Sequence, residues 1–427
     1  MHHEYVKSIV LKLCRQPRTF EYISNNLSGL EPTETIKFLE SLEAENVIQH
    51  IDDFWVIKKI PISTTLSLYQ EEAKHYLQQY MGYFDFLKTP HPLDFEWRNT
   101  TKSLNNLITK AIQLTGPNDN ILFLGMPTLF ATAIERDIPN MVTLIERNEP
   151  IVAGLKRLVI EKKRFKILQE DIFTIEPNKI GIQSLVVMDP PWYTPHFKQF
   201  MWLAAKSIKI GGTVAISIPP INTRPSIMEE RIEWFSYCLK LGLCIETLQP
   251  NQLQYSMPFF EFNAFRAAGV TDILPFWRKG DFVIFKKLID TNEERPALLL
   301  NQENWTEINI EGVRLRVKKD PKSVDTTENL KIESIVHGDI LPTISSRDER
   351  RREANIWTSG NRIFWTNDTY KFLSIYDAAQ AGKESLFEAS ELETVNGFLQ
   401  MITNLEKKEF NDFIDWLYYE MERETTH

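Results

Sequence analysis

The residues best suited to chemistry in this sequence form one run, Asp189, Pro190, Pro191, Trp192 and Tyr193. Two successive prolines cannot continue a central strand, so they hold their carbonyl groups away from the hydrogen bonds of a sheet. An aspartate beside them can accept a hydrogen bond from an amino group and orient the nitrogen lone pair. A neighbouring aromatic ring can stack on a flat base or surround a cation. A proline-rich turn that merely ends a buried strand is the alternative interpretation.

The segments around this run alternate between short apolar stretches and stretches of helical length. Strand candidates lie at 120–125, 141–146, 165–169, 183–189 and 212–219, and two later ones at 243–248 and 281–287. This βαβ rhythm predicts a doubly wound α/β sheet of seven strands. Open α/β sheets bind ligands beyond the carboxyl ends of their strands, so residues 189–193 are expected to face a ligand.

The same five residues resemble the D-P-P-[YWF] motif of S-adenosylmethionine-dependent amino methyltransferases, and the resemblance extends over residues 100–288. It implies a Rossmann-like methyltransferase fold and methyl transfer to an exocyclic nitrogen, adenine N6 or cytosine N4. Asp189 and the Pro190 carbonyl would hold the amine, and Trp192 or Tyr193 would stack on its ring. The cofactor residues that it implies are a loop after the first strand and two acidic residues after the second and third strands, namely Leu124, Gly125, Met126, Glu146 and Asp171.

A second resemblance is to the branched-chain polyamine synthases, which share this fold and transfer an aminopropyl group from decarboxylated S-adenosylmethionine to a polyamine. It rests on the segments ILFLG at 121–125 and DPPWYTP at 189–195, behind an N-terminal winged helix. That family carries acidic residues after the first strand, where this chain has Gly125, Met126, Pro127 and Thr128. Aminopropyl transfer is therefore one alternative to methyl transfer. A catalytically degenerate scaffold that binds a partner protein or a nucleotide is another.

Residues 1–60 carry the pattern of three helices and a hairpin, which predicts a winged-helix domain. The expected recognition helix would repel phosphates, because it holds one lysine, Lys37, against Glu34, Glu40, Glu43 and Glu45. This charge pattern favours docking to a protein partner or dimerisation over binding to duplex DNA.

The remaining domain boundaries follow from changes in pattern. We predict a helical connector at 61–119, the methyltransferase-fold domain at 120–288 and a C-terminal α+β domain at 289–427. Within the last, 296–319 predicts a hairpin that turns near Glu311 and Gly312, and 385–424 has helical spacing throughout.

Three further groups of residues are candidate functional sites, and each also has an ordinary structural interpretation. The aromatic run at 259–265 could stack on a flipped base or serve as a packing face, and packing is the commoner use of such stripes. His196 is a candidate proton carrier or a surface histidine at a helix start. Arginines of the C-terminal region could contact a nucleic acid or a protein partner, namely Arg350, Arg351, Arg352 and Arg362. The alternative interpretation is that they lie at a solvated helix end.

Composition limits the class of protein. The chain has 427 residues with 49 Lys and Arg against 58 Asp and Glu, a net charge of −9, so a nucleic acid would have to be met by a local basic patch. The three cysteines, Cys14, Cys238 and Cys244, show no C-x-x-C spacing and indicate neither a disulfide framework nor a structural zinc site. We expect a cytoplasmic homo-oligomer that needs no metal, without a signal peptide or a membrane-spanning run.

Overall fold

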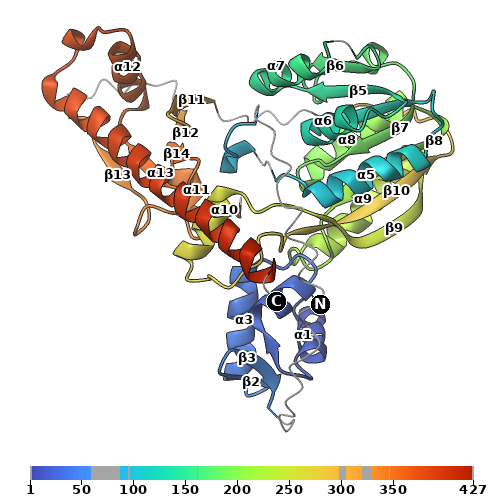
Figure 1. Ribbon diagram of the computed structural model, residues 1–427, viewed down its shortest axis with the longest axis horizontal. Helices are drawn as coiled ribbons and strands as arrows, with labels where there is room; N and C mark the ends of the chain where they lie inside the picture. Colours follow the sequence, from blue (N-terminus) through green and yellow to red (C-terminus); the bar gives the residue numbers. More distant parts are fainter. Residues whose placement is uncertain are drawn as a thin grey trace. The chain divides into compact units, whose positions relative to one another are not determined.

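The computed structural model describes residues 2–58, 87–94, 97–160, 162–297, 304–319, 329–345 and 347–425. They pack into two compact units, which are taken in turn below (Figure 1). The first unit comprises 1–87, 98–256 and 272–299, and the second 88–97, 257–271 and 300–427. The segment 257–271, which the sequence places within the sheet domain, therefore packs with the second unit. Residues 61–86, 95 and 96 of the connector expected at 61–119 lie outside the described residues.

The first unit begins with an N-terminal module, residues 2–58. Three helices are followed by a hairpin, in the predicted order, and a short strand pairs with the hairpin to give a three-stranded antiparallel sheet, β1-β3-β2. Asp52 turns the hairpin with a φ of 51°. The module has its own core, which includes Val10, Leu39 and Trp55. The elements are α1 (His2–Leu13), β1 (Arg18–Thr19), α2 (Phe20–Asn26), α3 (Pro32–Ala44), β2 (Ile48–Ile51) and β3 (Phe54–Ile57).

A seven-stranded sheet follows, in the spatial order β6-β5-β4-β7-β8-β10-β9. The strands from β6 to β8 run parallel, whereas β10 is antiparallel to both β8 and β9, so the sheet is mixed. All seven predicted strands are present, and β8, β9 and β10 are longer than predicted. Their bounds are β4 (Asn120–Leu124), β5 (Met141–Glu146), β6 (Phe165–Gln169), β7 (Gln183–Met188), β8 (Ile208–Ile218), β9 (Leu243–Gln254) and β10 (Lys279–Lys287).

Helices cover both faces of this sheet, which explains why its central strands are almost continuously apolar. Successive side chains of a strand point to opposite faces. Leu122 of β4 accordingly joins the core beneath α8 and α9, while Ile121 and Phe123, on the opposite face, are also fully buried. Among the helices, α5, α6 and α7 pack on one another, as do α8 and α9. Their bounds are α5 (Thr101–Gln113), α6 (Pro127–Glu135), α7 (Glu149–Leu158), the short η3 (Pro177–Lys179), α8 (Thr194–Ser207) and α9 (Ile227–Lys240).

The second unit is built on a five-stranded antiparallel sheet, β11-β12-β14-β15-β13, with a long C-terminal helix. The predicted hairpin forms and turns through Glu311 and Gly312, whose φ angles are 51° and 91°. The strands are β11 (Trp305–Ile310), β12 (Val313–Lys318), β13 (Ile332–Ser334), β14 (Ile356–Thr358) and β15 (Ile363–Thr366). The helices are η2 (Pro92–Asp94), α10 (Phe259–Ala267), α11 (Arg350–Glu353), α12 (Thr369–Gln380), η4 (Glu384–Leu386) and α13 (Ala389–Thr425).

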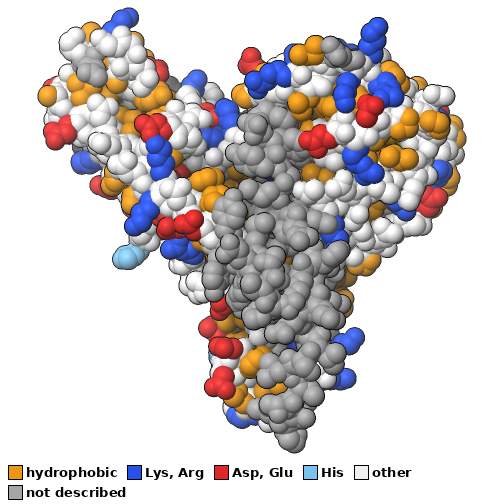
Figure 2. All heavy atoms as spheres, viewed as in Figure 1, with side chains coloured by type: hydrophobic (Ala, Val, Ile, Leu, Met, Phe, Trp, Pro, Cys, Tyr) orange, Lys and Arg blue, Asp and Glu red, His pale blue; other side chains and the backbone are white. Residues whose placement is uncertain are grey.

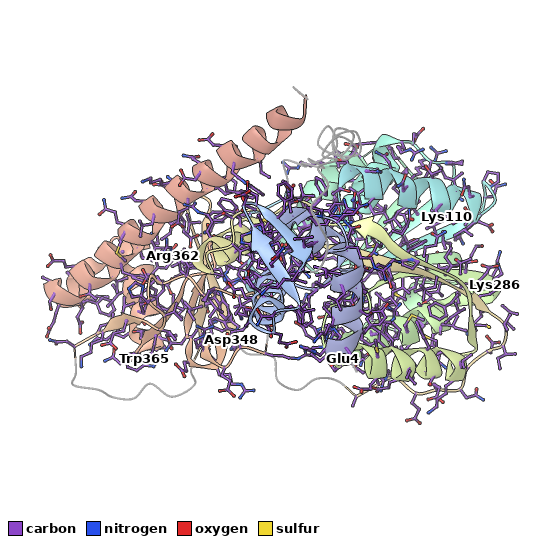
Figure 3. All side chains as sticks on the ribbon, turned by 90° about the horizontal axis from the view of Figure 1, so that it is seen from below. Glu4, Lys110, Lys286, Asp348, Arg362 and Trp365 are labelled. Carbon is purple, nitrogen blue, oxygen red and sulfur yellow. The ribbon has the colours of Figure 1, made fainter. Side chains whose placement is uncertain are left out.

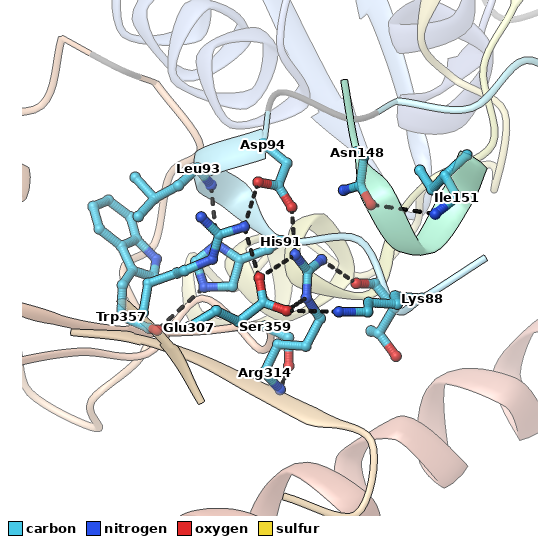
Figure 4. Close-up of polar contacts among 12 residues, drawn as sticks. Lys88, His91, Leu93, Asp94, Asn148, Ile151, Glu307, Arg314, Trp357 and Ser359 are labelled. Carbon is cyan, nitrogen blue, oxygen red and sulfur yellow. Dashed lines mark hydrogen bonds and ion pairs between the residues drawn. The ribbon is translucent and has the colours of Figure 1, made fainter. Parts of the chain in front are cut away.

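A buried ion-pair network holds the segment 88–94 to this second sheet (Figure 4). Arg314, 2% exposed, donates to Asp94 at 2.7 Å and to Glu307 at 2.8 Å. His91 lies next to it, with Nε2 3.1 Å from the Trp357 carbonyl, and burial lowers its pKa to about 3. The imidazole stays neutral, so the charges of this cluster come from the two carboxylates and from Arg314, Arg316 and Lys88, which pair with them.

Candidate functional site

The structure brings the residues predicted for cofactor and acceptor to one edge of the seven-stranded sheet. β4 lies between β5 and β7, and the register pairs Leu124 with both Ile145 and Met188. The residues that come next along each strand, Gly125, Glu146 and Asp189, therefore lie level at the carboxyl edge. Ligands of open α/β sheets bind at this edge.

Gly125 forms the turn above the first strand. Its φ of +63° lies in the left-handed region that only glycine adopts readily. Leu124 and Met126 on either side are buried, whereas Gly125 is exposed, so its backbone is open to solvent. Met126 thus packs into the protein at the start of α6 instead of covering the glycine. The turn therefore exposes its backbone directly beyond the end of β4.

Glu146 and Asp171 each have a carboxylate whose direction is set by a local turn. Glu146, at the end of β5, accepts a hydrogen bond from the backbone N–H of Asn148 at 2.8 Å. Asp171, two residues beyond β6, accepts one from the N–H of Phe173 at 2.8 Å and contacts Arg147 at 3.5 Å. Because each carboxylate oxygen can accept more than one hydrogen bond, these contacts orient the groups and still leave acceptor capacity.

Asp189 is held by hydrogen bonds to both of its carboxylate oxygens. The Tyr255 hydroxyl donates to Oδ1 at 3.0 Å, and the Asn99 amide donates to Oδ2 at 3.3 Å. Asn99 and Tyr255 face each other across an antiparallel bridge, which sets both side chains against the same carboxylate. Ser217, on β8, lies 2.5 Å from the Tyr255 hydroxyl and completes a buried chain of polar groups.

This environment changes the acidity of Asp189. The residue keeps some exposure, but burial of its carboxyl group raises its pKa to about 6, and the hydrogen bonds from Tyr255, Ser217 and Asn99 limit the rise. Burial and the charge of Asp189 also raise the pKa of Tyr255, which therefore remains a donor. At pH 7 Asp189 is ionised in about nine molecules of ten. A carboxylate with this pKa accepts a proton at a much smaller free-energy cost than an ordinary aspartate does.

The rest of the run, residues 190–193, is held by two arginines. Pro191 accepts a hydrogen bond from the Tyr193 N–H at 2.7 Å, which closes a tight turn. Arg224 donates to the Trp192 carbonyl at 2.7 Å, and its guanidinium lies 5.9 Å from the centre of the Tyr193 ring. The guanidinium of Arg278 lies 5.9 Å from the centre of the Trp192 ring. Both aromatic rings are half-buried.

Five polar residues of this cluster were missed by sequence reasoning, namely Asn99, Ser217, Arg224, Tyr255 and Arg278. Each is a single polar residue in an ordinary strand or loop, and no spacing rule connects it to residues 189–193. Their role follows only from the strand pairing.

The aromatic run at 259–265 is a packing face in the structure. Its phenylalanines lie on α10 and are buried against α13, with Phe259 5.3 Å from Phe410 and Phe262 5.1 Å from Phe413 between ring centres. His196, at the start of α8, is half-buried beside Phe173, and burial lowers its pKa.

The arginines expected to contact a partner differ in their surroundings, and Figure 3 labels one of them, Arg362. Arg362 is 4% exposed and pairs with Glu409 and Asp339, so the structure gives it an internal role in place of the expected surface contact. Arg350 pairs with Asp348 at 2.7 Å, and Arg351 lies 4.3 Å from the centre of the Trp357 ring. Arg352 is exposed. Partner binding by this region stays a prediction.

The exposed side of α3 is acidic, in line with the charge pattern of the sequence. Glu34, Glu40, Glu43 and Glu45 are all exposed, and Figure 2 shows acidic side chains gathered along one side of this module. Among the described residues, no helix combines the length and the apolar character needed to cross a membrane.

Comparison with known proteins yields solved structures alone: no family model and no curated protein matches the chain. The branched-chain polyamine synthase from Thermus thermophilus, solved with N4-aminopropylspermidine and 5'-methylthioadenosine, is 14% identical with a TM-score of 0.50; the match covers 68% of this chain and 88% of that one. Fibrillarin from Methanococcus jannaschii is 13% identical over 57% and 83% of the two chains, with a TM-score of 0.31. An O-methyltransferase family protein from Burkholderia thailandensis is 12% identical over 68% and 94%, with a TM-score of 0.29.

At these identities the comparison with the polyamine synthase establishes a shared fold. The mixed seven-stranded α/β sheet is consistent with the Rossmann-like methyltransferase fold.

Proposed function

We propose that this chain is an S-adenosylmethionine-dependent transferase that methylates an amino nitrogen, with the exocyclic amino group of a nucleobase as its acceptor. The observation that carries the proposal is the Asp189 carboxylate, oriented through both oxygens by Asn99 and Tyr255 at the sheet edge where Gly125 is exposed.

The side chains at the cofactor end fit a sulfonium nucleoside. In this proposal the exposed backbone of Gly125 would contact the methionine part, Glu146 would hold the ribose hydroxyls and Asp171 would contact the adenine. When bound, S-adenosylmethionine would supply an electrophilic methyl group, whose carbon–sulfur bond breaks with the electron pair kept on sulfur to leave S-adenosylhomocysteine.

At the acceptor end, Asp189 and the Pro190 carbonyl accept hydrogen bonds from the amine and turn its lone pair toward the methyl group. Trp192 or Tyr193 stacks on the ring that carries the amine. As the new nitrogen–carbon bond forms, the nitrogen loses a proton. Asp189 can accept this proton because its pKa of about 6 lies close to neutral pH.

The charges around residues 189–193 favour a neutral amine over a polyamine. Arg224 and Arg278 lie beside the two aromatic rings, and the carboxylate of Glu230 is already paired with Arg224. A polyamine carries several positive charges that carboxylates must offset, and the charge of Glu230 is already offset by Arg224. Asp189 is the carboxylate that this segment itself contributes.

Aminopropyl transfer is kept as the second candidate because of one observation, the fold shared with the Thermus polyamine synthase over 88% of that chain. The two reactions differ in donor and in product mass. Calorimetry with S-adenosylmethionine, decarboxylated S-adenosylmethionine and S-adenosylhomocysteine, followed by mass spectrometry of candidate amines, separates them. Heat with the first and third ligands and a methyl mass shift are expected.

The catalytic role is tested by Asp189→Ala beside Glu135→Ala, a change at an exposed residue of α6. We expect Asp189→Ala to lower kcat about 100-fold or more while the affinity for S-adenosylhomocysteine is kept. Glu135→Ala should leave both unchanged. Full activity of Asp189→Ala would refute the assignment, and absence of heat with all three ligands would favour a scaffold.

A further inference from the structure

The N-terminal module contacts two segments of the first unit that also hold residues 192 and 193. The first segment is the loop 219–226, which follows β8. Asn222 in this loop is fully buried and donates to the Leu27 carbonyl at 2.8 Å. Gly29 packs so closely on the same loop that an added Cβ would lie 2.8 Å from Thr223 Oγ1. The loop is therefore fixed in place by the turn between α2 and α3.

The second segment is the start of β10. Lys279 donates to the Asn25 carbonyl at 3.1 Å, and burial lowers its pKa to about 8. The residue before it is Arg278, whose guanidinium lies over the Trp192 ring. This contact with the module is independent of the loop 219–226, because it lies at the start of β10, whereas the loop follows β8.

Both segments reach the run 189–193 at their other ends. Arg224, two residues after Asn222, donates to the Trp192 carbonyl and lies beside the Tyr193 ring. The Arg224 guanidinium also donates a hydrogen bond to Glu230, and Glu230 accepts a second one from the Ser226 hydroxyl at 2.6 Å. These bonds restrict the arginine to one orientation. Pro190 and Pro191 have no N–H groups, so the run has few backbone donors with which to fix itself. Its position depends on contacts from outside.

We propose that the N-terminal module positions the acceptor-binding run 189–193 through these two arms, with Asn222 and Arg224 in one arm and Lys279 and Arg278 in the other. The module is then a part of the site and not a separate nucleic-acid reader, in agreement with the acidic exposed side of α3. The inference rests on the proposed function in one respect, that Trp192 and Tyr193 bind the acceptor.

Hydrogen–deuterium exchange of the full chain tests this inference without any substrate. The reporters are peptides spanning 189–197, which contain the Tyr193 N–H bonded to Pro191. In Asn222→Ala and in Lys279→Met we expect exchange in these peptides to rise about 2- to 10-fold, the effect of losing one ordinary hydrogen bond. Peptides spanning 141–146 should not change, and neither should any peptide in Lys12→Ala, an exposed position of the same module.

Unchanged exchange at 189–197 in both variants would overturn the inference, and so would a rise spread evenly over the whole chain. A kinetic readout follows where methyl transfer is observed: the acceptor KM should rise while the affinity for S-adenosylhomocysteine stays constant. If the chain binds no sulfonium nucleoside, the proposed function fails while the exchange result still decides the positioning role.

Discussion

The hydroxyl of Tyr255 is the contact at Asp189 whose removal gives the sharpest prediction. It donates to Oδ1 of the carboxylate at 3.0 Å from a fully buried position. Tyr255→Phe removes this donor and keeps the ring that packs against Trp192 at 5.7 Å. The ionised form of Asp189 loses a stabilising interaction, while its burial is unchanged. Its pKa must therefore rise above the native value of about 6.

The size of the shift follows from the energy of the lost bond. A hydrogen bond to a charged group contributes about 1.5–3 kcal/mol, and one pKa unit corresponds to about 1.4 kcal/mol. We therefore expect a rise of roughly one to two units. At pH 7 half or more of the variant would then carry a protonated Asp189, compared with about a tenth of the native protein.

Two measurements check this shift. NMR titration of the carboxyl carbons of aspartate gives the pKa of Asp189 directly, with Asp189→Asn to assign the signal. Where methyl transfer is observed, the acidic limb of the pH profile of kcat/KM should move to higher pH by the same amount. Tyr370→Phe, at an exposed tyrosine, serves as the control. A midpoint that stays near 6 or falls in Tyr255→Phe would refute the reasoning.

Three further predictions concern other parts of the chain. Burial raises the pKa of Glu406, which is 1% exposed, to about 7, above the value of the unfolded chain. The folded state therefore favours the protonated carboxyl, and the unfolding free energy should fall by roughly 3 kcal/mol as the pH rises from about 4.5 to 8. Glu406→Gln should abolish this dependence, which denaturant unfolding at pH 5 and pH 8 measures. Arg314→Met removes the most deeply buried cation of the network, while Arg316 still pairs with Asp94 and Glu307. It should lower the unfolding free energy by roughly 1.5–3 kcal/mol, whereas unchanged stability would contradict the network's role. In Gly125→Ala the added Cβ has space, since its nearest neighbour lies at 3.6 Å, but alanine must adopt a left-handed φ. The substitution should lower the unfolding free energy by about 1–2 kcal/mol. Thermal unfolding measures this change, with Gly116→Ala, at a glycine without a positive φ, as the control.

The sheet of the first unit could be predicted because its strands are buried on both faces. Segments such as 141–146 are then short apolar runs with clear ends, and they coincide with the observed strands. β9 was predicted to end at Leu248 but continues to Gln254, because its edge position exposes most of its side chains and removes the apolar signal. The spacing of Leu104, Leu107, Ile108 and Ile112 indicates a helix, and α5 forms there. The first three of these side chains are buried and Ile112 is half-buried.

The candidate site was predictable only in part. Asp189 and its prolines form one contiguous motif, so their residue types alone indicate a function. The residues that set the acidity of Asp189 lie 90 and 66 positions away in the chain, at Asn99 and Tyr255, and neither has a distinctive neighbourhood. The placement of 257–271 in the second unit could not be read from helical spacing either, because it depends on contacts with α13, more than a hundred residues later.

The division of the chain between its two units has a consequence for synthesis and for truncation. The second unit draws on 88–97 and 257–271 as well as on everything after 300. The ribosome synthesises these two segments before β11, β12 and α13. Until those elements exist, Asp94 lacks its ion-pair partners and the phenylalanines of α10 are exposed to solvent. A chain truncated near residue 300 would never form these contacts. A shortened chain of this kind should aggregate or recruit chaperones, although every strand of its main sheet would be intact.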